Sequence, residues 1–200
     1  MTNVLTFRVE IDGLEDKIWR VIEITDKKTV AELAYTILAT FDSVAYHLYK
    51  IKYKDKVYDS WIDIEDDHSD IPKLNATIIK LSELDLVKND YLEMDYDLGS
   101  TTTFKIHFLG CQELKKGTGR HYPYIVSGAG RGMMDDLSDF ELKEIVNDID
   151  QKGYSKYKFT PGYDRTIKYD YRDFDLNSNN VLLKGEIAEI KDKYEEIEYE

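Results

Sequence analysis

Four side chains of the types used in acid–base or metal chemistry stand out in the sequence. Asp97 follows a stretch of alternating apolar and acidic residues, and His121, Asp135 and Asp136 belong to a glycine-rich stretch. Two carboxylates near a histidine could transfer protons or hold a divalent cation such as Mg²⁺. The simpler interpretation is that Asp135 and Asp136 favour the positive end of a helix that begins near Ser138. We keep both interpretations, of which the second needs fewer assumptions.

Metal binding has little other support in the sequence. The four histidines show no i, i+4 spacing on a helix, and we expect His47 to be a hydrogen-bonded residue of the core or sheet. The acidic run over 63–70 begins like a calcium loop but lacks the required glycine and bidentate glutamate, so we expect a solvated loop. Cys111 is the only cysteine, which excludes an internal disulfide and a cysteine-based zinc site. We therefore predict no metal site and no cofactor, apart from a divalent cation at the four side chains above.

A cluster of tyrosines near the C-terminus offers a different kind of site. Tyr163, Tyr169 and Tyr171 are our candidate binding residues, in a stretch rich in tyrosine and aspartate. Tyrosine gives a large, rigid contact area with a polar tip, which protein interfaces favour. Ordinary packing of an irregular C-terminal layer explains the cluster equally well.

Composition limits the classes of partner. The chain has 200 residues, of which 42% are hydrophobic, and 40 acidic against 27 basic residues give a net charge of −13. A surface this negative repels nucleic-acid backbones and anionic lipid, so we expect a protein partner and no membrane. The N-terminal stretch resembles a strand rather than a signal peptide, and no apolar run is long enough to span a bilayer. We therefore expect a cytoplasmic protein.

The elements that must position these residues begin with a hairpin and a helix. Alternating apolar residues predict strands over 5–11, 18–24 and 47–54. Thr29 and Glu32 form a capping box, followed by apolar residues at helical spacing as far as Phe41. In the second strand Arg20 interrupts an apolar face; with Trp19 it could line a ligand face, although packing against the helix is the default. This order predicts an α+β fold with a β-grasp-like mixed sheet and a helix packed across one face.

The second half of the chain predicts a further hairpin and a C-terminal layer of helices and irregular segments. Residues 91–109 form the hairpin, 81–84 one helical turn, and 59–76 and 110–135 are expected to be loops or irregular. Ser138 and Glu141 form a second capping box, and the helix that follows is expected to end near Gly153. Residues 184–197 predict a last helix. No repeat or long linker appears, so we predict one domain over 1–200.

Several of these segments together carry a family resemblance. They are IWRVIEI with TVAEL and HLYKI, the hairpin YLEMDYDLGS, Tyr122-Pro123 followed by Gly128, and the closing DYRDFDLNSNNVLL. In this order they resemble the plasmid pRiA4b ORF-3-like family. The resemblance implies an α+β, β-grasp-like fold over nearly the whole chain and an association with plasmids and mobile elements. Some members carry a resolvase-like label, which the acidic charge and the absence of a recombinase nucleophile argue against here.

The chain departs from the family pattern at the positions that could form a site. Where the family continues D-F-G-D-x-W-x-H, this chain keeps Asp97 and Gly99 but has Ser100, Thr102 and Phe104 in place of the aspartate, tryptophan and histidine. Where it continues P-P-E-D-x-G-G, only the acidic pair at 135–136 remains. If these motifs form a site in relatives, this chain has lost or remodelled it.

These observations favour a non-enzymatic binding or adaptor module with a protein partner. The sequence leaves enzymatic activity undecided, and the balance lies against it. The first alternative is a metal-assisted hydrolase or transferase that uses Asp97, His121, Asp135 and Asp136. The second is a nucleic-acid accessory protein of a mobile element, which rests on the resemblance alone.

Overall fold

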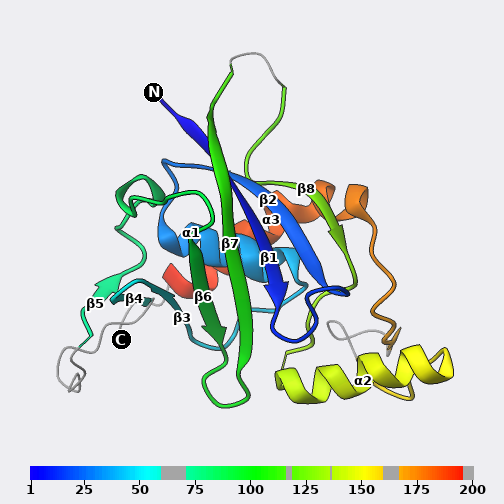
Figure 1. Ribbon diagram of the computed structural model, residues 1–200. Helices are drawn as coiled ribbons and strands as arrows, with labels where there is room; N and C mark the ends of the chain where they lie inside the picture. Colours follow the sequence, from blue (N-terminus) through cyan, green and yellow to red (C-terminus); the bar gives the residue numbers. More distant parts are fainter. Residues whose placement is uncertain (60–70, 116–118, 136, 160–166, 196–200) are drawn as a thin grey trace.

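The computed structural model describes residues 1–59, 71–115, 119–135, 137–159 and 167–195. Within them, eight strands form one mixed sheet in the order β5-β4-β3-β6-β7-β1-β2-β8 (Figure 1). Its neighbours are antiparallel except β4 and β5, which are parallel. The strands of this sheet are β1 (Asn3–Ile11), β2 (Trp19–Thr25), β3 (Tyr49–Tyr53), β4 (Lys56–Asp59), β5 (Lys73–Asn75), β6 (Tyr91–Tyr96), β7 (Thr102–Glu113) and β8 (Tyr124–Ala129).

The remaining elements are mainly helical, and they confirm the predicted α+β class. They are α1 (Val30–Thr40), the 3-10 turn η1 (Leu81–Glu83), α2 (Asp139–Lys152), the short pair β9 (Lys158–Phe159) and β10 (Ile167–Lys168), and α3 (Leu176–Glu195). None of the described helices is long and apolar enough to cross a membrane. The β-grasp-like arrangement of the strands stays a prediction.

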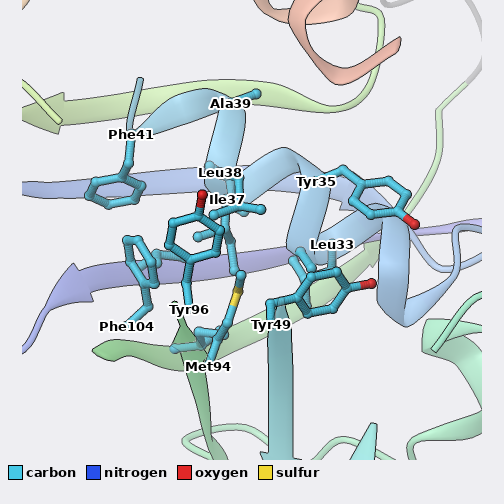
Figure 2. Packing of buried hydrophobic residues seen from close by; sticks show 14 of the residues in the cluster. Leu33, Tyr35, Ile37, Leu38, Ala39, Phe41, Tyr49, Met94, Tyr96 and Phe104 are labelled. Carbon is cyan, nitrogen blue, oxygen red and sulfur yellow. The ribbon is translucent and has the colours of Figure 1, made fainter. Parts of the chain in front are cut away.

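Helix α1 is the centre of the core. The predicted capping box is present: the Glu32 N–H donates to Thr29 Oγ1 over 3.1 Å, and the Thr29 N–H donates to Glu32 Oε2 over 2.9 Å. Every residue of the helix except Glu32 is buried, because the sheet covers one side of the helix and α3 covers the other. The Tyr35 ring shows both contacts. It lies edge-on to Tyr49 of β3 (Figure 2), and it stacks on Tyr194 of α3, with the ring centroids 5.4 Å apart.

The C-terminal end of α1 packs on a second aromatic group. Phe41 lies edge-on to Phe104 of β7, with ring centroids 5.1 Å apart, and Tyr96 of β6 lies beside both rings (Figure 2). All three side chains are fully buried. Phe104, which stands where the family pattern has a histidine, is therefore a core residue in this chain.

Several segments differ from the sequence prediction, and three of them affect the sheet edges and the last helix. Tyr124–Ala129 was expected to be irregular but forms the edge strand β8, which pairs with β2. Lys73–Asn75 was expected to be loop but pairs with β4. The last helix begins at Leu176 instead of residue 184, because Asp175 caps its N-terminus and the Asn180 side chain bonds both the N–H and the C=O of Ile125 in β8. These tertiary contacts outweigh the low helix propensity of the asparagines and serine in the first turns.

Helix α2 lies at one end of the sheet (Figure 1), bounded as predicted by the Ser138–Glu141 capping box and by Gly153 in the left-handed conformation. Asp139, in its first turn, accepts from the Thr103 N–H at 3.2 Å. Burial raises the pKa of Asp139 to about 6 despite this bond and the nearby Lys143. The ionised carboxylate therefore destabilises the fold at neutral pH.

We predict that the change D139N stabilises the protein at pH 7 by about 1 kcal/mol, a figure reduced for the partial exposure of the group. The folded pKa is raised, so the contribution of Asp139 is favourable at low pH and is lost as the pH rises through about 6. The advantage of D139N in urea unfolding should accordingly shrink as the pH falls from 7 to 4. D148N, which removes an exposed carboxylate of the same helix, is the control; an equal pH dependence in both variants contradicts the assignment.

Candidate functional site

Asp135 joins the end of β6 to the segment that follows α1. Its Oδ1 accepts hydrogen bonds from Ser43 Oγ at 2.7 Å and from the Tyr96 hydroxyl at 2.8 Å, and its Oδ2 accepts from the Val44 N–H at 2.9 Å. Burial and the Asp135 charge raise the pKa of the Tyr96 phenol, which stays protonated and donates. With three donors in place, this carboxylate has little capacity left for a metal ion or a substrate proton.

Asp97 directly follows Tyr96 in the chain and lies close to a histidine. His47 Nε2 is 3.6 Å from Asp97 Oδ2, and the His47 ring lies edge-on to Tyr96. Asp97 takes the left-handed conformation at φ 55°, its Oδ1 accepts from the Gly99 N–H at 3.0 Å, and its own N–H donates to the Leu48 carbonyl at 3.0 Å. From the sequence we expected His47 to be only a core or sheet residue. Its contact with Asp97 could not be predicted, because the two residues are fifty positions apart and meet only through the register of β3 with β6.

The structure does not bring His121 to this group. His121 is exposed and lies three residues before Tyr124, which pairs with Glu23 of β2. Tyr96, next to Asp97, pairs with Thr102 at the opposite end of the sheet strands (Figure 1). Asp136 lies outside the described residues. Within the described ranges, no group of three or more histidine, cysteine or acidic side chains is placed to hold a metal ion.

The predicted tyrosine surface is corrected at one position. Tyr169 is 1% exposed, and its hydroxyl donates to the Gly132 carbonyl at 2.9 Å, so it packs the protein interior instead of facing a partner. The Tyr171 hydroxyl donates to Asp150 of α2. Tyr163 lies outside the described residues.

A cleft of about 610 Å³ opens beside Asp135, between the segment after α1 and the outer helix α3. Its apolar floor includes Ala39, Met133, Met134 and Ile190. Its walls are charged and aromatic: Asp42, Ser43, Val44 and Tyr46 on one side, Arg131, Asp135 and Tyr157 next to them, and Glu186, Glu189 and Lys193 from α3. We call this cavity the acidic cleft, since it has four carboxylates against two cations.

The carboxylates of the acidic cleft are not equally neutralised. Glu189 pairs with Lys193 at 2.9 Å, and Asp42 accepts from the Gly132 N–H at 3.1 Å. For Glu186, no hydrogen bond or ion pair is found among the residues the structure describes. Burial, together with Asp42 and Glu189, raises the pKa of Glu186. Among the described lining residues, the cleft therefore carries more negative charge than its two cations compensate.

Arg20, a possible ligand-facing residue in the sequence, has an internal role. It is 0% exposed, and its guanidinium donates to the carbonyls of Thr40, Trp19 and Ala129 over 2.8–3.0 Å. It also lies between the Phe41 and Phe174 rings, at 4.9 and 3.9 Å from their centroids. Burial lowers the pKa of Arg20 to about 10, so the group stays charged at neutral pH.

Gly128 belongs to the same packing. A Cβ at this position would lie 2.9 Å from both Arg20 Cδ and the Trp19 carbonyl, and 3.1 Å from the Phe174 ring. We call these residues, Arg20, Phe41, Gly128 and Phe174, the Arg20 cluster. Three of its members come from segments that carry the family resemblance, and their shared role is to join β2, β8 and the start of α3.

Comparisons with known proteins agree with this fold. Residues 3–178 match the model of a family described as plasmid pRiA4b ORF-3-like protein. The crystal structure of a protein of unknown function, MM3350 from Methanosarcina mazei Go1, is similar with a TM-score of 0.69 and 19% sequence identity, covering 88% of this chain and 96% of that chain. At this identity the likeness shows the fold alone. A comparison with curated proteins gave no match.

We predict that G128A lowers the free energy of unfolding by about 1–3 kcal/mol, because the added methyl overpacks the Arg20 cluster. G185A is the matched control: Gly185 lies inside α3 with no atom within 4 Å of a new Cβ. That variant should gain up to about 1 kcal/mol from helix propensity. Urea unfolding of both variants measures the difference, and a loss of similar size in both contradicts the packing argument.

A second prediction concerns Asp135. D135A should lower the free energy of unfolding by about 2–4 kcal/mol, since it leaves the buried Tyr96 hydroxyl and Ser43 Oγ without their acceptor. D135N keeps one acceptor oxygen and should lose about half as much. D16A, at an exposed position, is the control in the same denaturation experiment. A D135A variant as stable as D16A shows that Asp135 does not hold this segment.

Proposed function

The chain belongs to the plasmid pRiA4b ORF-3-like family, and from that premise we propose that it is a non-enzymatic, cytoplasmic binding module of the adaptor type. Its acidic cleft takes a lysine or arginine side chain of a protein partner. The observation that carries the proposal is Glu186, a half-buried carboxylate that has no hydrogen-bond or ion-pair partner in the described part of the chain and lies beside two further carboxylates.

The electrostatics of the cleft support a cationic ligand. Burying an ionised carboxylate costs free energy unless a cation or hydrogen-bond donors compensate. Asp42 and Glu189 increase this cost for Glu186, as its raised pKa indicates. A bound ammonium or guanidinium group reduces the repulsion among the three carboxylates. This reduction in repulsion contributes to the binding free energy.

The shape and lining of the cleft fit a long side chain with a charged end. A volume of about 610 Å³ lies within the range of pockets that bind small ligands. The methionines and aliphatic residues of the floor can cover the methylene chain of lysine or arginine, while the carboxylates meet its charged end. The net charge of −13 also steers basic partners toward the molecule.

The candidate catalytic residues give less support to an enzyme. Asp135 is occupied by three donors, and His121 lies far along the sheet from Asp97. The remaining His47–Asp97 pair is not part of the cleft lining, so it does not face the cavity that a substrate would occupy.

We predict that a short acetylated and amidated peptide with two lysines binds the protein, and that its glutamine analogue does not. E186Q should weaken binding of the lysine peptide by about three- to tenfold, because it removes one partly buried charge partner. Isothermal titration calorimetry at low salt measures both peptides. Binding should also weaken as the pH falls toward the raised pKa of Glu186, because protonation removes its charge.

D16N is the matched control, since it changes the net charge by the same amount at an exposed position outside the cleft. It should bind like the unmodified protein. Equal weakening in E186Q and D16N means that only the overall charge attracts the peptide, and equal affinity for the lysine and glutamine peptides removes the proposal.

A further inference from the structure

A row of exposed apolar side chains lies beside the acidic cleft. Val44, Tyr46 and Leu48 are 44%, 54% and 49% exposed, while the residues between them point inward or are half-buried. Leu98, 51% exposed, follows Asp97, whose N–H bonds the Leu48 carbonyl. We call these four residues the apolar strip. Single exposed apolar residues are normal on a protein surface, but a contiguous row indicates an interaction site.

The backbone beneath the apolar strip is fixed. The Val44 N–H donates to Asp135, and the Val44 carbonyl accepts from Lys193 Nζ at 2.9 Å. The His47 carbonyl accepts from the Tyr194 hydroxyl. A surface held in this way loses little conformational entropy when a partner binds.

The apolar strip is continuous with the acidic cleft, because Val44 and Tyr46 line both. From this continuity we infer that the partner is an amphipathic basic segment of another protein. Its apolar side chains lie on the apolar strip, and a neighbouring lysine or arginine enters the acidic cleft. The inference rests on the proposed function and adds the chemistry of the partner segment to it.

Charge complementarity selects this partner over other apolar surfaces. Asp42, Glu186 and Glu189 lie on the cleft side of the strip, and Asp97 adjoins Leu98. Carboxylates at these positions repel anionic lipid headgroups and nucleic-acid phosphates, but they attract the basic residues that flank the apolar face of an amphipathic helix.

The test uses two synthetic peptides with the same number of lysines. In the first, leucines at i, i+3, i+4 and i+7 give the helix an apolar face; in the second, serines replace these leucines. Fluorescence anisotropy at low salt should show the leucine peptide binding about tenfold more tightly. The double variant L48S/L98S should remove this preference and leave the affinity for the serine peptide unchanged, because neither leucine lines the cleft.

Further variants separate this inference from the proposed function. E186Q should weaken both peptides to a similar extent, and V87S, which changes an exposed apolar residue outside the strip, should weaken neither. A preference for the leucine peptide that persists in L48S/L98S overturns the role of the strip and leaves the cleft intact. If neither lysine peptide binds, both proposals fall. If spermidine binds as tightly as the leucine peptide, the occupant is a small polyamine and the strip has no part in it.

Discussion

The constraint on which the structure depends is a buried charge. A guanidinium removed from water is costly unless its donors find acceptors. Arg20 offsets part of this cost by donating from Nε and Nη1 to three backbone carbonyls and by lying against two aromatic rings, while its buried Nη2 has no hydrogen-bond partner among the described residues. Those carbonyls belong to β2, β8 and the last residue of α1, and the outer ring belongs to Phe174. One side chain therefore sets where the sheet edge, the central helix and the C-terminal layer meet.

The acidic cleft follows from that junction. Arg20 Nε donates to the Thr40 carbonyl, and this hydrogen bond holds the C-terminal end of α1 in place. The chain therefore leaves the helix at Phe41 and Asp42 in a defined direction. Gly132 can approach the Phe41 backbone only because it has no side chain: a Cβ there would lie 2.0 Å from the Phe41 carbonyl oxygen. The Met133 N–H then donates to that carbonyl, and Asp135 bonds Ser43 and Val44. Two segments ninety residues apart thus form one wall, against which α3 closes the cleft.

The sequence predicts the features that depend on neighbouring residues and misses those that depend on distant ones. Both capping boxes, the 91–109 hairpin and the Gly153 helix end are local patterns, and all are present. Strand β8 ends in three small residues, Ser127, Gly128 and Ala129, and shows no clear alternation. It is a strand because β2 pairs with one of its edges and the Asn180 side chain bonds the other. Likewise, the sequence places Arg20 within an otherwise apolar strand face, and only the distant Phe174 ring explains how it is buried. The proximity of His47 to Asp97 also depends on distant residues, because it requires the β3–β6 register.

The segments that carry the family resemblance converge in two places with different roles. Arg20, Gly128 and Phe174 join the layers, whereas Tyr96 donates a hydrogen bond to Asp135, which lines the acidic cleft. The family match ends at residue 178, but the α3 wall of the cleft, with Glu186, Glu189 and Lys193, lies beyond it. The Arg20 junction and the floor residues Ala39, Met133 and Met134 thus lie in the matched region, whereas Ile190 and the charged residues of the outer wall lie outside it. If the acidic cleft binds the partner proposed above, the exposed face of the last helix sets the charge that this partner meets, while the junction that holds the cleft together does not depend on that face.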